Sequence, residues 1–198
     1  MIFIFDLDGT ITAQETLPLI ASRFGVEEEI AELTRETIQG HVPFIESFIR
    51  RVHILGHLPV SEIDSLLENV KLHKQIHNFV KQNSEKCAIA TGNLDCWVSL
   101  LIKKIGCKTY TSKAEVVNNK VVAIKEILKK EEVVQYYQNK GEKVVYIGDG
   151  NNDIEAMRIA DISIAAGLTH YPANSILPFA HYLIFNEKSL CRQLNQLL

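Results

Sequence analysis

The chain has 198 residues, of which 46% are hydrophobic and 23% are charged, and it carries a net charge of −3. This length fits one domain, or one domain with a small insert, at roughly 150 residues per domain. The slightly acidic balance argues against a dedicated nucleic-acid binder, and no apolar run reaches the length of a transmembrane helix. The four cysteines form no paired metal or disulfide pattern and we recognise no signal peptide, so we expect a cytoplasmic protein.

The first predicted element is a buried strand at residues 2–5, and a helical segment follows it. No strand-like run occurs between residues 14 and 71, where apolar residues recur at helical spacing instead. This segment contains four such patterns, at 15–24, 27–38, 43–56 and 61–70. We therefore predict a small all-helical cap at 14–71, inserted after the first strand of a core that consists of 1–13 and 72–198.

The remaining chain alternates short apolar runs with helical patterns. The runs predict buried strands at 87–90, 144–147, 162–164 and 182–184. Helical patterns lie between most of them, near 94–105, 130–140 and 151–159. Residues 115–117 and 121–124 flank a short polar turn and predict a β-hairpin. This alternation predicts a doubly wound α/β core with a mostly parallel sheet.

Polar clusters follow three of the predicted strands: DLDGT from residue 6, TGN from residue 91 and GDGNND from residue 148. Ligands of an open α/β sheet bind beyond the carboxyl ends of the strands, so these clusters should meet in one crevice. Four carboxylates in one crevice repel one another unless a cation lies among them, and Mg²⁺ with oxygen ligands is the simplest such cation. A free carboxylate beside Mg²⁺ suggests phosphoryl transfer, because it can attack phosphorus and form an acyl phosphate.

DLDGT, TGN, a lysine and GDGNND, in this order between residues 6 and 153, resemble the four-motif signature of the haloacid dehalogenase superfamily of phosphohydrolases. The resemblance implies a Rossmann-like core, with Asp6 as the nucleophile and Asp8 as general acid and then general base. It also implies a Mg²⁺ site whose ligands come from Asp6, the backbone carbonyl of Asp8 and Asp149. Asp153 would support this metal shell.

The same resemblance implies that Thr91 and the backbone amide of Gly92 bind phosphoryl oxygens, with Asn152 in support. A lysine must also neutralise charge on the transferred phosphoryl group. The sequence leaves three candidates for this lysine: Lys125, Lys129 and Lys130. In the similar enzymes the lysine opens a helix shortly before an apolar pair, and this favours Lys130 because a Val-Val pair follows it.

Within the superfamily, the predicted cap resembles that of the phosphoserine phosphatases, from DLDGTITAQET through RFGVEEEI and IQG to SFIRRV. This resemblance implies that Glu15 binds the substrate amino group, that Arg51 binds the substrate carboxylate and that Phe44 lines an apolar pocket. Helix geometry supports Arg51 separately. The apolar face of the helix at 43–56 is formed by Ile45, Phe48, Ile49, Val52 and Leu55. Relative to that face, Arg50 should point to water, while Arg51 can reach round the edge.

We therefore expect a Mg²⁺-dependent phosphatase that hydrolyses a small phosphate ester, O-phospho-L-serine, in serine biosynthesis. It should act as a monomer or homodimer, with no nucleic-acid or membrane partner. Alternatives are transfer of the phosphoryl group to another hydroxyl such as that of homoserine, another small ester as substrate, or a catalytically idle regulatory domain. Asn93 stands where those phosphatases usually carry glycine, so its side chain could change the substrate set. Residues 170–174 could rim the site, but we predict a surface loop there.

Overall fold

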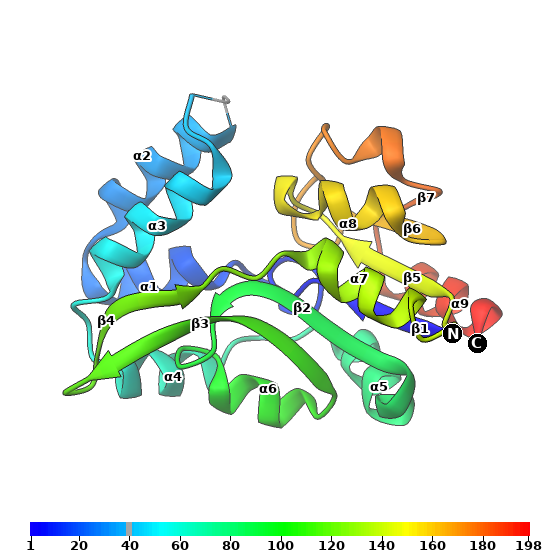
Figure 1. Cartoon of the computed structure of the whole chain (residues 1–198), viewed down its shortest axis with the longest axis horizontal. Coiled ribbons are helices and arrows are strands. Elements are labelled where there is room, and N and C mark those ends of the chain that lie inside the picture. The colour runs from blue at the N-terminus through cyan, green and yellow to red at the C-terminus, as the bar shows by residue number, and fades with distance from the viewer. Residues whose placement is uncertain (39–40) are drawn as a thin grey trace.

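Seven strands form the centre of the computed structural model, which describes residues 1–38 and 41–198. In chain order they are β1 (Ile2–Phe5), β2 (Cys87–Leu94), β3 (Lys108–Val117), β4 (Lys120–Glu126), β5 (Val144–Gly148), β6 (Ile162–Ala166) and β7 (Tyr182–Ile184). Their order in the sheet is β4-β3-β2-β1-β5-β6-β7 (Figure 1). All neighbouring strands are parallel except β3 and β4, which are antiparallel. This order confirms the predicted doubly wound, mostly parallel α/β sheet.

Helices cover both faces of the sheet. Side chains of successive β1 residues point to opposite faces, and they pack into two different hydrophobic clusters. Phe3 and Phe5 meet the ring of Phe79 edge-on, with centroid distances of 5.5 and 6.5 Å. Ile2 and Ile4 pack into the second cluster, on the opposite face. The first face is covered by α5 (Lys74–Gln82), α6 (Ser99–Ile105) and α9 (Glu187–Leu197), and the second by α7 (Lys130–Gln138) and α8 (Ile154–Ile159).

Among the described residues, four helices lie between β1 and α5, in the segment that the sequence assigns to a cap. They are α1 (Thr16–Phe24), α2 (Glu27–Ile38), α3 (Phe44–Leu55) and α4 (Val60–Glu68). In Figure 1, α2 and α3 stand together at one end of the molecule, whereas α4 lies beside α6. Asp64 of α4 accepts hydrogen bonds from the hydroxyl of Ser99 and the N–H of Leu100, so α4 is anchored to the core. The role of the segment as a cap stays a prediction.

Among the described residues, no helix combines the length and apolarity that a membrane crossing needs.

The observed boundaries differ from the predicted ones mainly around β2 and β3. β2 continues to Leu94, so the helix predicted from residue 94 begins only at Ser99. β3 starts well before the predicted hairpin arm, because its first half pairs with β2 and its second half with β4. The hairpin turn lies at Asn118 and Asn119, whose φ angles of 50° and 64° are in the left-handed region that asparagine tolerates.

Candidate active site

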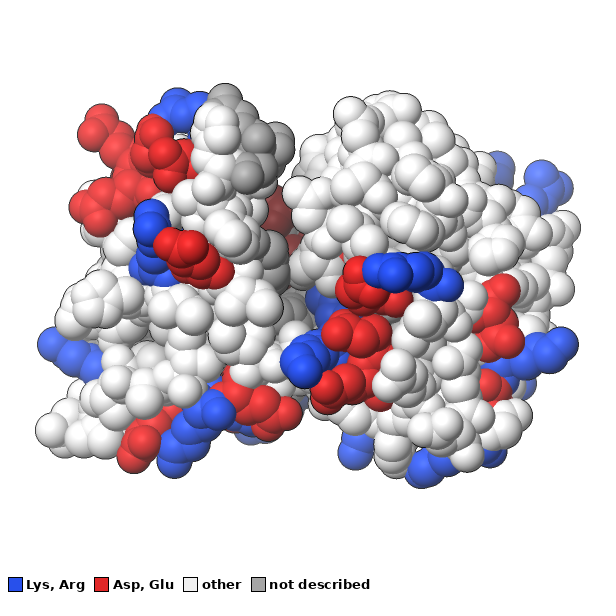
Figure 2. Space-filling model, turned by 45° about the horizontal axis from the view of Figure 1, so that its top comes forward, with Lys and Arg blue, Asp and Glu red and all other residues white. Residues whose placement is uncertain are grey.

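The carboxyl ends of β1, β2 and β5 meet α1, α2 and α3 at a cavity of about 360 Å³. Figure 2 shows this cleft between the part of the molecule that carries α2 and α3 and the rest. The volume lies in the range of small-molecule sites. Of the predicted site residues, those that line the cavity are Asp6, Asp8, Glu15, Arg51, Thr91, Gly92, Asn93, Asp149 and Asn152.

Lys130 bridges two buried carboxylates, those of Asp153 and of Asp6, and the second of these lines the cavity. It is the first residue of α7, its side chain is 2% exposed, and its Nζ lies 2.6 Å from Asp6 Oδ1 and 2.7 Å from Asp153 Oδ1. Burial alone would lower the pKa of Lys130, but the charges of Asp153 and Asp6 outweigh it and raise that pKa. Lys130 is therefore a cation, and it compensates part of the negative charge that burial places beside it.

The geometry separates the three candidate lysines. Lys125 forms an exposed ion pair with Glu115, and Lys129 forms one with Glu132 on the outer surface of α7. Lys130 is the one of the three whose ammonium group reaches Asp6. The position follows from the helix register, because the first residue of α7 points at the carboxyl ends of the neighbouring strands.

Asp153 is held by donors on both of its oxygens. Oδ1 accepts hydrogen bonds from Lys130 Nζ and from the buried hydroxyl of Tyr146, at 2.7 and 2.6 Å. Oδ2 accepts the N–H groups of Asp149 and Gly150, at 3.0 and 2.9 Å. The turn after β5 is thereby fixed, and Asp149 is aimed at the cavity. Tyr146 was not among the predicted site residues, because in the sequence it is an ordinary apolar residue of a buried strand.

Three buried carboxylates form a group that could hold a metal ion. One ligand oxygen each of Asp6, Asp149 and Asp153 lies within 4.8 Å of the others, and all three residues are buried. Burial raises the pKa of Asp6 well above its ordinary value, and burial also raises that of Asp149. A donor set made only of oxygens fits a hard divalent cation. The carboxylate of Asp8 binds Thr16 and Asn93 instead, so Asp8 would reach a metal through its backbone carbonyl.

Asp8 has a pKa that suits both an acid and a base. Burial is the largest cause that raises the pKa of Asp8, and the negative charge of Glu15 raises this pKa further. Hydrogen bonds from Thr16 lower it, and the net result is a pKa of about 7. A carboxyl group with this pKa is present in both protonation states near neutral pH. Asp8 also lines the cavity beside Asp6, so it is placed to exchange protons with a bound ligand.

The TGN segment forms an irregularity at the end of β2. Thr91 pairs with Thr111 and Leu94 with Ser112, so the two intervening residues have no partners in the β2–β3 ladder. Such a bulge redirects side chains. Here it brings Gly92 and Asn93 to the cavity wall. Asn152, from the 3₁₀ turn Asn151–Asp153, lines the same cavity.

On the helical side of the cavity, Arg51 and Arg50 point to different environments. Arg51 lines the cavity, donates from Nη2 to Thr34 Oγ1 at 3.1 Å, and its buried Nε finds no acceptor among the described residues. Burial lowers the pKa of Arg51, and the charge of Glu15 opposes that shift. Arg50 forms an exposed ion pair with Glu46. Arg51 is therefore the arginine that can contact a ligand.

The apolar face of α3 is only partly buried. Phe48 is buried and lines the cavity, but Ile45 and Ile49 are 54% and 47% exposed. The apolar pattern of α3 therefore identifies a face that is buried only in part. Phe44 opens α3, but its side chain, predicted to line a pocket, lies outside the described part of the chain.

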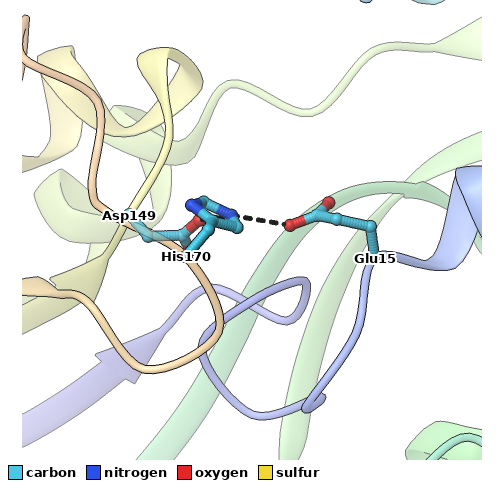
Figure 3. Close-up of side chains that lie close together, drawn as sticks. All are labelled: Glu15, Asp149 and His170. Carbon is cyan, nitrogen blue, oxygen red and sulfur yellow. Dashed lines mark hydrogen bonds and ion pairs between the residues drawn. The ribbon is translucent and has the colours of Figure 1, made fainter. Parts of the chain in front are cut away.

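His170 lies in an exposed loop, as predicted, and it also lines the cavity, which is the alternative that the sequence left open for residues 170–174. Figure 3 shows its ring between two carboxylates from distant parts of the chain. Its Nε2 lies 2.9 Å from Glu15 Oε1 and 3.1 Å from Asp149 Oδ2. Hydrogen bonds to Asp149 and then to Glu15 raise the pKa of His170 to about 11. One sequence signal pointed there: the loop follows the carboxyl end of β6, beside β5.

The model of the haloacid dehalogenase-like hydrolase family matches residues 3–158 of the chain. Two similar proteins are both named phosphoserine phosphatase. The one from Methanocaldococcus jannaschii is 27% identical over 177 residues, which cover 83% of this chain and 84% of that protein. The one from Archaeoglobus fulgidus is 26% identical over 177 residues, which again cover 83% of this chain but only 52% of that protein. The chain thus matches about half the length of the second relative.

A solved structure, described as a phospho-aspartyl intermediate analogue of phosphoserine phosphatase, shares the fold. Its TM-score is 0.80 at 22% identity, and the match covers 97% of both chains. The family match runs from β1 into α8 and includes DLDGT, TGN, Lys130 and GDGNND, so it confirms the resemblance that these motifs indicated. The chain belongs to the haloacid dehalogenase-like hydrolases.

Proposed function

We propose that this protein is a Mg²⁺-dependent phosphatase that hydrolyses O-phospho-L-serine to serine and inorganic phosphate. The buried group of Asp6, Lys130 and Asp153, with Asp8 beside it, carries this proposal. It combines a carboxylate nucleophile, a fixed cation and a carboxyl group with a pKa of about 7, which hydrolysis through a covalent phosphoenzyme requires. The names of the similar proteins support phosphoserine as the substrate.

In the first step, an oxygen of Asp6 attacks phosphorus and the bond between phosphorus and the serine oxygen breaks. Protonated Asp8 gives its proton to the departing oxygen, so that serine leaves as a neutral alcohol. The raised pKa of Asp8 supports this role, since a substantial fraction of the group is protonated near neutral pH. Thr91 and the amide of Gly92 would hold the non-bridging phosphoryl oxygens.

In the second step, ionised Asp8 takes a proton from water as the water oxygen attacks phosphorus. The bond between phosphorus and the Asp6 oxygen breaks, which releases phosphate and restores the Asp6 carboxylate. Asp8 is again protonated for the next cycle. Lys130 stays 2.6 Å from Asp6 in the resting enzyme, and its charge opposes the negative charge that collects on the reacting oxygens.

The buried oxygens of Asp6 and Asp149 fit Mg²⁺, which would supply further positive charge to the phosphoryl oxygens. The backbone carbonyl of Asp8 would complete the protein ligands, and Asp153 would keep Asp149 in place through the hydrogen bonds of its Oδ2. Mg²⁺ keeps several water ligands, so two or three protein oxygens are enough.

Arg51 and Glu15 would recognise the amino-acid part of the substrate. The buried Nε of Arg51 lacks an acceptor among the described residues, and a carboxylate can supply one through a two-pronged contact. Glu15 lines the same cavity and carries the opposite charge that an ammonium group needs. Asn152 would support the phosphate, and Phe44 would line the apolar part of the pocket.

We further propose that the segment at 14–71 acts as a cap that closes over the bound ester and excludes water. The position of α1, α2 and α3 across the cavity from the strand ends supports this role. The enzyme would work in the cytoplasm, in serine formation, as a monomer or homodimer whose partner is the small-molecule ester alone.

Phosphate release from O-phospho-L-serine tests the proposal, with and without Mg²⁺ and beside a panel of other small phosphomonoesters. We expect preference for phosphoserine, dependence on Mg²⁺ and loss of activity in Asp6→Asn. Strong turnover of another ester with little of phosphoserine would overturn the substrate, while keeping the chemistry. Failure of every ester would overturn the proposed function as a whole.

A further inference from the structure

Asn93 is turned toward Asp8 rather than into open space. It is 5% exposed, and its Nδ2 lies 2.6 Å from Asp8 Oδ2 and 3.0 Å from Thr16 Oγ1. The hydroxyl of Thr16 in turn lies 3.4 Å from Asn93 Oδ1. This orientation of the amide suits ionised Asp8, because an ionised carboxylate only accepts hydrogen bonds. The two hydrogens of this amide are therefore engaged within the protein.

Asp8 is held from two directions. Oδ2 accepts the hydrogen bond from Asn93, at the bulge of β2, while Oδ1 accepts the backbone N–H of Thr16 at 2.9 Å. Thr16 is the first residue of α1, where N–H groups have no partners within the helix. Each oxygen of Asp8 thus has its own donor, and the donors lie on two separate elements. This arrangement fixes both the position and the rotation of the carboxyl group.

We propose that Asn93 is a positioning residue for Asp8, rather than a contact for the substrate. The sequence predicts instead that the Asn93 side chain contacts the substrate, because it lies near the expected phosphate site and could change the substrate set. The inference rests on the proposed function, in which Asp8 transfers the protons of both steps. Without the Asn93 amide, Asp8 would keep one of its two donors and could rotate about the bond to its carboxyl group.

A change of leaving group separates the two proton transfers. Departure of the serine oxygen needs the proton of Asp8, but p-nitrophenolate is stable as an anion and leaves without one. The second step is the same for both substrates, since water must lose a proton to Asp8 as it displaces Asp6 from phosphorus. A badly positioned Asp8 should therefore slow both steps with phosphoserine, but only the second step with p-nitrophenyl phosphate.

The experiment compares wild type with Asn93→Ala on both substrates. For phosphoserine we expect kcat to fall roughly 10- to 100-fold with KM changed less than about threefold. For p-nitrophenyl phosphate we expect a rapid burst of p-nitrophenol, close to one equivalent of enzyme, followed by slow turnover. Acid quenching should then trap the phosphoryl group on the protein, and Asp6→Asn should show neither burst nor trapped phosphate.

Thr16→Val provides a second variant, in case Asn93→Ala folds poorly. It removes the hydroxyl that holds the Asn93 amide but keeps the backbone N–H bonded to Asp8, and the two side chains have nearly the same shape. With p-nitrophenyl phosphate we expect Thr16→Val to show a burst of p-nitrophenol as well, smaller than that of Asn93→Ala.

A rise in KM for phosphoserine at unchanged kcat, without a burst in either variant, would overturn the inference and return Asn93 to substrate binding. Inactive wild type would instead overturn the proposed function, so the two failures are distinguishable.

Discussion

The two walls of the cavity differ in how completely their polar groups are hydrogen-bonded. On the strand side, the Asp153 carboxylate has four donors, and Asp149 Oδ1 accepts the hydroxyl of Thr10 at 2.9 Å. On the helical side, Arg51 donates one hydrogen bond to Thr34 and its buried Nε finds no acceptor among the described residues. The strand side is fixed before a ligand arrives, whereas the helical side has capacity left for one.

This difference fits two separate roles, in which the strand side carries out the chemical steps and the helical side recognises the substrate. Groups that stabilise a transition state work best when they need no rearrangement, and fixed partners provide that. A buried donor without a partner is costly, and a ligand that supplies the partner recovers that cost. Changes on the strand side should therefore affect kcat most, and changes on the helical side should affect KM and substrate choice.

The largest expected effect follows the loss of Lys130. In Lys130→Met we expect kcat to fall roughly 10³-fold, because the fixed ammonium group that opposes charge on the transferred group would be lost. The buried carboxylates of Asp6 and Asp153 would also lose the positive charge that compensates them, which should cost about 3–5 kcal/mol of stability. Steady-state kinetics and thermal unfolding measure both, with activity expressed per folded protein.

Lys129→Met is the matched control, since it makes the same change one residue earlier at an exposed side chain. We expect its kcat within about twofold of wild type. Equal losses in the two variants would show that the hydrogen bonds of Lys130 to Asp6 and Asp153 have no role in turnover, and would remove the basis for the fixed strand side.

The next effect, on the helical side, should depend on the substrate. In Arg51→Ala we expect kcat/KM for phosphoserine to fall roughly 10- to 100-fold, since a charged hydrogen bond to the carboxylate is lost. For p-nitrophenyl phosphate, which has no carboxylate, we expect a change below about threefold. Arg50→Ala serves as the control, because Arg50 pairs with Glu46 at the surface. Equal losses for both substrates would contradict carboxylate recognition by Arg51.

The strand side was the more predictable wall. Asp6, Asp8 and Asp149 directly follow short apolar runs, and parallel strands bring such positions together at one edge of the sheet. Lys130 is different, because its partner Asp6 lies 124 residues away and the local pattern also allowed two neighbouring lysines. Only the packing of α7 against the sheet decides which lysine reaches the carboxylates.

The helical side and the loops were less predictable for two physical reasons. Apolar periodicity identifies the face of α3 but not what covers that face, so it gives no sign that Ile45 and Ile49 are exposed. Loop conformation leaves no periodic signal, so the sequence alone did not bring His170 to Glu15 and Asp149. Asn93 lies between these cases: its place at the site was predictable, but its hydrogen bond to Asp8 depends on the bulge in β2.

Mg²⁺ binding to the strand side should stabilise the folded protein against unfolding, by less than the loss expected in Lys130→Met. At a Mg²⁺ concentration about 100 times its dissociation constant, we expect about 2.7 kcal/mol, which is roughly 5–10 °C in the unfolding temperature. A chelator should reverse the shift. Asp149→Asn should lose most of it, while Glu155→Gln, which removes a surface carboxylate of α8, should keep it. An undiminished shift in Asp149→Asn would place the metal elsewhere.

The smallest expected effect concerns His170, which lies between the two walls. Its pKa is raised to about 11 in the folded protein from an ordinary 6.5, so its stabilising contribution is complete below pH 6.5 and is lost as the pH rises through 11. The side chain is 43% exposed, so solvent screening should limit the effect to below about 1 kcal/mol. Without divalent cations, His170→Ala should therefore unfold a few degrees below wild type at pH 6.5, and the gap should narrow as the pH rises toward 11.

His57→Ala makes the same change at an exposed histidine outside the cavity, so it serves as the matched control. Mg²⁺ then sharpens the comparison of the walls, because His170 Nε2 contacts Asp149 Oδ2 and Asp149 is a proposed metal ligand. We expect half-saturation of the thermal shift at a lower Mg²⁺ concentration in His170→Ala than in wild type. An unchanged half-saturation point would mean that His170 and the metal use different oxygens, so that Asp149 can hold the metal while it stays bonded to His170.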